Sequence, residues 1–349
     1  MNQKINYEVL LSNGFRKTQS ESPSNIALIK YWGKVDGQIP MNPSISYTLD
    51  KCKTTFEVFF KKSDTPSSTK FYFEGLLAPS FAAKSLNLLE IIQKDFPELS
   101  NYELILNSKN SFPHSSGIAS SASSMSALSI CLLDIINKSN DLNLVSYYAR
   151  LGSGSACRSI FSPMASWGKN KLGNDFTDEF ATEISGAISN KLKSIGDTIV
   201  LVHEGEKEVS SSKGHALMNN HPYRETRIEN AKANFYKLIN ALREGDIKSW
   251  GEIIESEALE LHAMMMTSSP GFILVKPKTL EVIEKVRLIR RKYGVSTYFT
   301  LDAGPNVHIL YPLHERDEVL PLLNKYLVNL KMIHDQVGQG TRILKGSKC

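Results

Sequence analysis

The chain has few cysteines, and no two of them stand close together. The four are Cys52, Cys131, Cys157 and Cys349, and none belongs to a CxxC pair. This spacing argues against a disulfide framework and against a cysteine zinc site. The stretch Met1–Tyr7 lacks the apolar core of a signal peptide, and no apolar run is long enough to span a bilayer. We therefore expect a cytoplasmic protein with reduced thiols.

An excess of one charge is also missing. Lys and Arg total 41 and Asp and Glu total 36, so the net charge is only +5, and no run of five or six basic residues occurs. Neither nucleic acid nor an anionic membrane surface is indicated as a partner, which leaves a small-molecule substrate. A length of 349 residues allows one large domain or two smaller ones, each with a sizeable core.

Extended and helical patterns alternate irregularly along the chain, which predicts a mixed α+β fold. We expect an irregular arm at 1–22, an N-terminal lobe at 23–190 and a C-terminal lobe at 191–349. The segments with strand character are 24–30, 54–60, 102–107, 197–203, 295–301 and 307–311, and those with helical periodicity are 81–95, 122–137, 227–244, 247–266 and 280–293.

The run Pro113–Ala122 contains one glycine and four serines, between a strand-like segment and an apolar helix. Small side chains leave backbone N–H groups open, and the helix that follows adds partial positive charge at its N-terminus. Such a loop binds phosphate groups, although it is neither a Walker A loop nor a dinucleotide fingerprint. The alternative is a solvated serine-rich linker, which would not require the flanking strand and helix.

A second small-residue run, Leu151–Arg158, contains two glycines and two serines before its arginine. Arg158 can bind a carboxylate or phosphate with two parallel hydrogen bonds. A helix–helix turn with a surface arginine explains the composition equally well. Cys157 has no base assigned by spacing, so we interpret it as a small packing residue.

Two lysines four residues apart, Lys30 and Lys34, enclose a Tyr-Trp pair and a glycine. One lysine near the reacting atoms and one on a phosphate would suit an anionic substrate. On spacing alone, a core strand that ends in two exposed lysines is the favoured interpretation.

A single carboxylate, Asp302, lies in a Gly-Pro turn between two apolar segments. It could act as a general base or orient a hydroxyl group, but aspartate is common in turns for conformational reasons alone. None of the histidines stands at metal-ligand spacing, and we interpret His262, next to three methionines, as a packed helix histidine.

Together and in this order, the four motifs resemble the diphosphomevalonate decarboxylase family of the GHMP kinase superfamily. The resemblance covers about residues 22–313. The matching strings are SNIALIKYWGK at 24–34, PHSSGIASSAS at 113–123, GSGSACRS at 152–159 and LDAGPNVHIL at 301–310. The loop at 113–123 is typical of the superfamily, whereas the first and third strings are narrower and point to the decarboxylases.

The resemblance implies a GHMP kinase-like two-lobed α+β fold, with an N-terminal lobe like ribosomal protein S5 and a C-terminal ferredoxin-like lobe. It implies that ATP phosphorylates the 3-hydroxyl of (R)-5-diphosphomevalonate. That step releases ADP, and loss of the new phosphate group together with CO2 then gives isopentenyl diphosphate in the mevalonate pathway of isoprenoid biosynthesis. It also implies Mg²⁺ and a homodimer.

The resemblance assigns roles to individual residues. Asp302 corresponds to the catalytic aspartate, Lys30 to a lysine beside it, and Arg158 to the arginine that binds the substrate carboxylate. The expected substrate contacts are Tyr31, Trp32, Gly33, Lys34, Lys70, Ser153, Gly154, Ser155, Ala156, Cys157, Ser211 and Ser212. The expected ATP contacts are Ser116, Gly117, Ile118, Ala119, Ser120 and Ser121, with Ser120 also a metal ligand.

Two departures from the family pattern leave the substrate open. Lys70 stands where we expect a substrate-contacting arginine, and Ser212 replaces an arginine or threonine beside Ser211. The alternatives are a decarboxylase acting on the monophosphate, or a GHMP kinase of another small molecule. A catalytically silent binding protein on the same scaffold is a further alternative, against which Lys30, Arg158 and Asp302 all argue.

Overall fold

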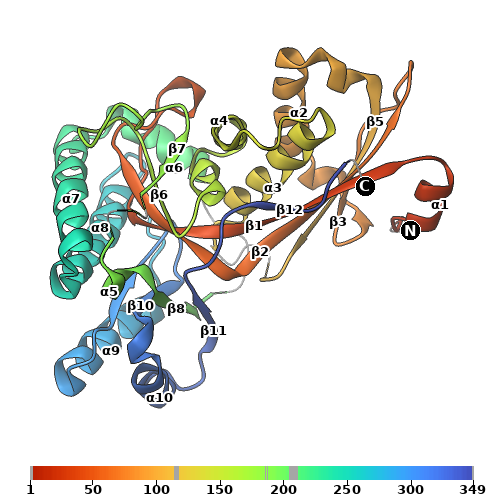
Figure 1. Cartoon of the computed structure of the whole chain (residues 1–349). Coiled ribbons are helices and arrows are strands. Elements are labelled where there is room, and N and C mark those ends of the chain that lie inside the picture. Colours follow the sequence, from red (N-terminus) through yellow and green to blue (C-terminus); the bar gives the residue numbers. More distant parts are fainter. Residues whose placement is uncertain (1–2, 114–117, 185, 187, 204–210, 348–349) are drawn as a thin grey trace.

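A computed structural model describes residues 3–113, 118–184, 186, 188–203 and 211–347, with only the backbone given for 211–213. It contains two β-sheets with helices packed around them (Figure 1). The large sheet comprises β1 (Arg16–Ile29), β2 (Ser44–Lys62), β3 (Lys70–Phe73), β4 (Leu76–Leu77), β5 (Tyr102–Asn110), β6 (Met164–Trp167), β7 (Ala181–Glu183) and β12 (Arg342–Lys345). The small sheet comprises β8 (Ile195–Leu201), β9 (Tyr298–Thr300), β10 (Val307–Pro312) and β11 (Lys331–Gln336).

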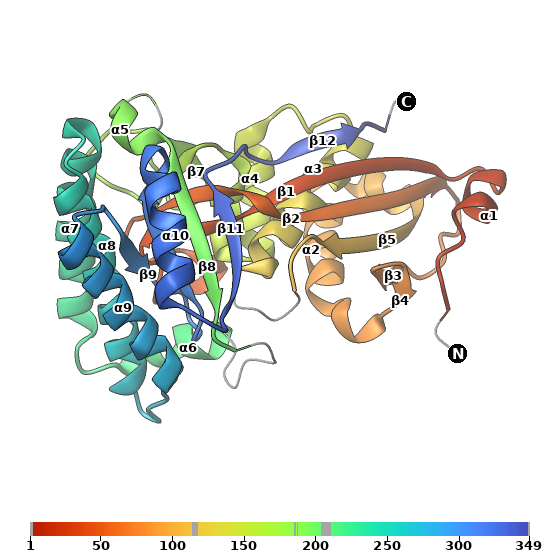
Figure 2. The same cartoon turned by 90° about the horizontal axis from the view of Figure 1, so that it is seen from below.

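The helices in the described part of the chain gather mainly around these sheets, as two views show (Figures 1 and 2). They are α1 (Tyr7–Ser12), α2 (Ala83–Asp95), α3 (Ser120–Ile135), α4 (Leu142–Gly152), α5 (Asn190–Lys193), α6 (Ser211–Leu217), α7 (Arg224–Glu244), α8 (Ile247–Met266), α9 (Pro277–Tyr293) and α10 (Arg316–Tyr326). Within the residues described, no helix combines the length and the apolar content that crossing a membrane requires.

The large sheet is built on the antiparallel pair of β1 and β2, in the order β12-β1-β2-β5-β3-β4. Helices α2, α3 and α4 share a hydrophobic core with β2 and β5. A second core joins the ends of β1 and β2 nearest the small sheet to β8, α7 and α8, and a third joins the small sheet to α9 and α10. The predicted α+β class is confirmed.

Two expectations about the chain ends were wrong. Residues 16–22 are not an irregular arm, because they form the first half of β1. Three of them bury hydroxyl groups instead of apolar side chains. The Thr18 hydroxyl donates a hydrogen bond to Asp134, the Ser20 hydroxyl donates to the Ala127 carbonyl, and the Ser22 hydroxyl forms a hydrogen bond with that of Thr341. At the other end, residues 342–345 do not join the other strands of the C-terminal lobe expected at 191–349. They form β12, which pairs with β1 in the large sheet.

Candidate active site

Lys30 and Asp302 meet where the two sheets face each other. Lys30 follows the last residue of β1, and Asp302 follows β9, so two distant parts of the chain form the pair. Nζ of Lys30 lies 3.1 Å from Oδ1 of Asp302 and also donates to the Ala27 carbonyl at 2.7 Å. The lysine side chain is 2% exposed and the aspartate 26%. A carboxylate that a ligand can reach is thus backed by a buried cation.

Burial and charge act in opposite directions on this lysine. Burial lowers the pKa of Lys30, whereas the charge and hydrogen bond of Asp302 raise it. The amine is therefore less basic than a surface lysine, and it sits close enough to share a proton with the carboxylate. Such a pair can accept, hold and return a proton during a reaction.

The backbone around the pair is fixed by two side chains that sequence reasoning did not assign to the site. Nε2 of His262 donates to the carbonyl oxygen of Asp302 at 3.1 Å. Burial lowers the pKa of His262 to about 4, so the ring is neutral and has one proton to donate. The Lys30 N–H donates to Oε2 of Glu257 at 3.0 Å, and Arg227 binds the same carboxylate at 2.7 and 2.9 Å.

Arg158 is held without a carboxylate partner in the described part of the chain. Its guanidinium donates to the hydroxyls of Ser46 and Ser44 at 3.0 and 2.8 Å, and to Asn25 at 3.5 Å. The residue is 2% exposed, and burial lowers its pKa, but an arginine stays charged in a protein. The charge of Asp302 acts on the guanidinium, but no carboxylate forms a hydrogen bond to it among the described residues, so this buried cation is suited to receive an anion.

The residues after Lys30 form an aromatic wall. Tyr31 packs against Trp167 and His215 with ring centroids 4.7 and 4.4 Å apart, and Trp32 also packs against His215, at 4.7 Å. The Gly33 N–H donates to Nδ1 of His215 at 3.0 Å. Burial lowers the pKa of His215 to about 3, which keeps Nδ1 free to accept that bond. The motif is thereby fixed to α6.

Lys34 lies near a second lysine that the sequence analysis missed. Burial lowers the pKa of Lys34, and the nearby charge of Lys84 lowers it further. Nζ of Lys34 donates to Gln38 at 2.7 Å, and Nζ of Lys84 donates to the hydroxyl of Ser121 at 3.3 Å. Lys84 therefore lies at the first turn of α3 with Lys34 near it, and the hydrogen bonds described for both ammonium groups go to uncharged side chains. Lys84, in α2, belongs to no recognisable motif.

The described part of the first serine-rich run leads directly into α3. Ile118 is buried and its carbonyl accepts a bond from Ser24. Ala119 has a left-handed backbone (φ 42°), and Ser120 and Ser121 begin the helix. The partial positive charge of this N-terminus favours phosphate. Ser116 and Gly117 lie outside the described residues.

The second small-residue run packs against the aromatic wall. A Cβ at Gly154 would lie 2.7 Å from the Tyr31 hydroxyl oxygen, so any larger residue there would displace the Tyr31 ring. Burial raises the pKa of Cys157 to about 12, and its thiol donates to the Gly154 carbonyl, consistent with a packing role. Ala156 is buried, and Ser153 and Ser155 are partly exposed. Ser211 and Ser212 begin α6, where only the backbone is described.

Lys70 does not join this cluster. In the sheet register Lys70 pairs with Ile105, Ile105 with Phe59, and Phe59 with Lys17. Lys17 and Ile29 are twelve residues apart on β1, which at about 3.3 Å per residue separates them by about 35–40 Å. Figure 1 shows β3 near α1, at the opposite end of the sheet from α6. The structure thus separates Lys70 from the other predicted substrate contacts and places Lys84 among them.

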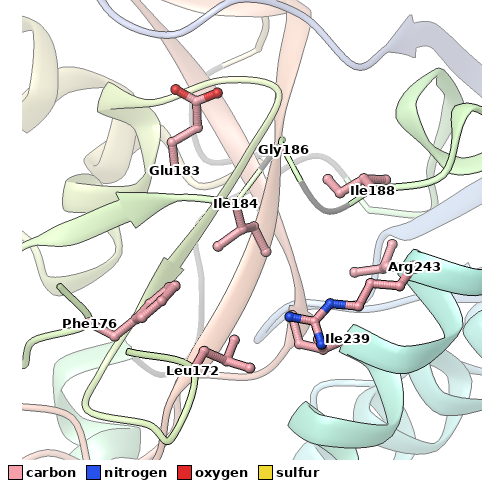
Figure 3. A pocket seen from close by; sticks show the side chains of 9 residues that line it. Leu172, Phe176, Glu183, Ile184, Gly186, Ile188, Ile239 and Arg243 are labelled. Atoms are coloured by element: carbon pink, nitrogen blue, oxygen red, sulfur yellow. The ribbon is translucent and has the colours of Figure 1, made fainter. Parts of the chain in front are cut away.

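A cavity of about 230 Å³ lies elsewhere, between residues 172–188 and α7 (Figure 3). Its lining is mostly apolar, and Glu183 and Arg243 provide the charged groups. It contains none of the predicted site residues, and several of its side chains belong to the core beneath the small sheet. We interpret it as imperfect packing rather than the reaction site.

The chain is similar to known proteins over most of its length. The model of the diphosphomevalonate decarboxylase-like N-terminal domain matches residues 22–181, and that of the mevalonate 5-diphosphate decarboxylase C-terminal domain matches 198–346. The chain is 29% identical to diphosphomevalonate decarboxylase of Candida albicans, over 87% of each chain. It is 29% identical to that of Saccharomyces cerevisiae, over 86% of this chain and 78% of the relative.

Solved structures give the same result. Mevalonate diphosphate decarboxylase of Staphylococcus aureus superposes with a TM-score of 0.84 at 28% identity, over 96% of this chain and 99% of that one. A structure named MDDEF, in complex with MVAPP, AMPPCP and magnesium, superposes with a TM-score of 0.82 at 29% identity, over 95% of this chain and 100% of that one. The predicted GHMP kinase-like architecture is confirmed by these likenesses.

Proposed function

Because the chain belongs to the diphosphomevalonate decarboxylase family, we propose that it uses ATP to convert (R)-5-diphosphomevalonate into isopentenyl diphosphate, ADP, phosphate and CO2. The observation that carries the proposal is the Lys30–Asp302 pair with Arg158 buried nearby. A hydroxyl must be activated and a carboxylate must be held, and these three side chains supply both functions.

In the first step the 3-hydroxyl oxygen attacks the γ-phosphorus of ATP, and the bond to ADP breaks. Asp302 either accepts the proton of the 3-hydroxyl group or orients that group. The buried ammonium of Lys30 stabilises the carboxylate of Asp302 in its ionised form. In the second step the bond to the carboxylate carbon breaks, its electrons form the new double bond, and phosphate leaves from carbon 3. Arg158 holds the carboxylate beside Asp302 until that bond breaks.

The phosphates of ATP fit the first turn of α3. Ser120 and Ser121 present hydroxyls there, and the helix N-terminus favours negative charge. Hydroxyl and phosphate oxygens are ligands that Mg²⁺ accepts, so Ser120 fits as a protein ligand to that ion. When bound, Mg²⁺ would neutralise part of the phosphate charge.

Lys34 and Lys84 are proposed to bind the 5-diphosphate, with Lys84 taking the role first given to Lys70. Charge-assisted hydrogen bonds of this kind contribute about 1.5–3 kcal/mol. We expect Lys84→Ala to raise KM for the diphosphate substrate about tenfold to a hundredfold with a smaller effect on kcat. Lys70→Ala is the matched control and should leave KM unchanged. Steady-state kinetics of both variants decide the assignment, and a larger effect at Lys70 would reverse it.

A decarboxylase for the monophosphate, or a GHMP kinase, is the second candidate. Lysine binds phosphate as a point charge rather than as a fork, so a lysine-lined pocket discriminates less sharply between one phosphate and two. Turnover of mevalonate, its 5-monophosphate and its 5-diphosphate should be compared with purified protein, ATP and Mg²⁺. We expect the highest kcat/KM with the diphosphate, and a preference for the monophosphate would favour the second candidate.

We further propose a cytoplasmic homodimer, which the family resemblance supports. The three described cysteines are free and buried, as in proteins of a reducing compartment. Light scattering coupled to gel filtration should give twice the mass of the 39.0 kDa chain. A monomer at micromolar concentration would contradict the dimer without affecting the proposed reaction.

A further inference from the structure

A buried acid–base pair lies behind Asp302 and takes no part in the steps above. Nδ1 of His308, in β10, lies 2.7 Å from Oδ2 of Asp197, in β8. The two side chains are 3% and 2% exposed. His308 stands opposite Thr300, the last residue of β9, and Asp302 follows two residues later. The pair is thus next to the strand that delivers the reacting carboxylate.

Both side chains point toward the large sheet. Residues directly opposite in an antiparallel ladder share a face, as do alternate residues along one strand. His308 is opposite Ile199, which is two residues from Asp197. Ile199 belongs to the core shared by the small sheet, β1, β2 and α8. Lys30 approaches from that same side at the end of β1, so the pair faces the active site.

Folding alone does not explain this pair. A buried ion pair is expensive to desolvate, and apolar residues of similar volume are often as stable or more so. Within the part of the chain that the structure describes, Oδ1 of Asp197 is buried and has no hydrogen-bond partner. An unsatisfied buried oxygen adds a further cost. These costs point to a role in the chemistry of the site.

The charges around His308 favour its protonated form. Burial lowers the pKa of His308, but Asp197 and then Asp302 raise it, the smaller effect of Lys30 opposes them, and the net pKa is raised. Burial raises the pKa of Asp197, the charge and hydrogen bond of His308 lower it, and the charges of Asp335 in β11 and of Asp302 raise it again, so the net pKa is raised. The raised pKa of His308 means that the charges of Asp197 and Asp302 favour the protonated ring.

We propose that His308, held by Asp197, is a positioning residue that stabilises the ionised carboxylate of Asp302 for the phosphorylation step. The inference rests on the proposed function, because it assigns a purpose to an ionised Asp302. His308 does not touch the substrate. It adds positive charge behind Asp302 on the strand side, while Lys30 supplies it from the opposite sheet.

The test is the pH dependence of kcat/KM. In His308→Gln the carboxylate of Asp302 loses the second cation, so it takes up a proton more readily, and the acid limb should move up by about one pH unit. In Asp197→Asn the ring loses the anion that holds its proton, but a negative charge near Asp302 is lost as well, so the limb should move in the same direction by less. His308→Lys keeps a cation and should leave the limb near its original position. A limb that stays in place in both His308→Gln and Asp197→Asn would overturn the proposal.

Asp335→Asn is the matched control. Asp335 is as buried as Asp197 and stands opposite it on β11, but it accepts bonds from the backbone N–H groups of residues 50–52. We expect this variant to lower the melting temperature and to move the acid limb less than Asp197→Asn does, because Asp335 influences the pair only through the charge of Asp197. If it moved the limb as far as Asp197→Asn, a general loss of packing would explain both, and the proposal would fail.

NMR of the full chain with ¹⁵N-labelled histidine measures the protonation state of the His308 ring without any substrate. The His308 ring should retain both protons at pH 7.5, and Asp197→Asn should release one. A neutral His308 ring in the unmodified protein would overturn the proposal. Because this measurement needs no turnover, it separates a failure of this inference from a failure of the proposed function.

Discussion

Replacing Asp302 with asparagine is expected to lower kcat at least about a hundredfold, the scale of a positioned acid–base group. Asparagine has nearly the same shape and still offers an oxygen to Nζ of Lys30, 3.1 Å away in the unmodified chain. It carries no negative charge, so it cannot take the hydroxyl proton. Steady-state rates of ADP formation measure the effect, and KM should change far less than kcat.

Two controls make the Asp302 result interpretable. Thermal unfolding should show that Asp302→Asn is folded, because the carbonyl contact with His262 comes from the backbone and survives the change. Asp317→Asn, at an exposed position on α10, should retain full activity. An Asp302→Asn variant with unchanged turnover would rule out the proposed role of this carboxylate.

Replacing Arg158 with glutamine is expected to lower kcat/KM about a hundredfold or more, the scale for one partner of a buried charge pair. The guanidinium donates to Ser44, Ser46 and Asn25, which fix its plane and leave its charge for the substrate carboxylate. Glutamine can replace at most part of this hydrogen bonding and none of the charge. Initial rates over a range of substrate concentrations provide the measurement.

Arg158→Lys separates charge from geometry. Lysine keeps the positive charge but cannot form hydrogen bonds to several oxygens in one plane. We therefore expect kcat/KM of Arg158→Lys to lie between the values of the unmodified protein and of Arg158→Gln. Loss of activity in Arg158→Gln with a proportional loss of folded protein would show a structural role only. Retention of kcat/KM within about threefold would exclude Arg158 from carboxylate binding.

The candidate site residues predicted from the sequence all belong to contiguous strings. Lys30 and Asp302 are 272 positions apart, and only the family resemblance connected them before the fold was known. The structure brings them into contact because β1 and β9 end at the same junction of the two sheets. Lys84, Glu257 and His262 could not be found in this way, since each belongs to a helix whose local pattern indicates only a surface or a core position.

The first half of β1 was missed for a different physical reason. Its buried positions carry Thr18, Ser20 and Ser22, so the apolar alternation that indicates a strand is absent. Their hydroxyls are satisfied by partners on α3 and near β12, which a local sequence pattern cannot reveal. Strand β12 could not be predicted either. Its four residues form a strand because they pair with the edge of β1, and a local sequence pattern does not reveal that pairing.

The most direct test of the proposed reaction measures CO2 release and ADP formation in the same sample. Purified protein should be incubated with ATP, Mg²⁺ and 5-diphosphomevalonate labelled in its carboxyl carbon, and the labelled CO2 and ADP should be counted in the same reaction. The Lys30–Asp302 pair with Arg158 predicts one CO2 for each ADP, with isopentenyl diphosphate as the organic product. ADP formed without CO2 would contradict decarboxylation and show a kinase, and the absence of both products would show a protein that binds without catalysis.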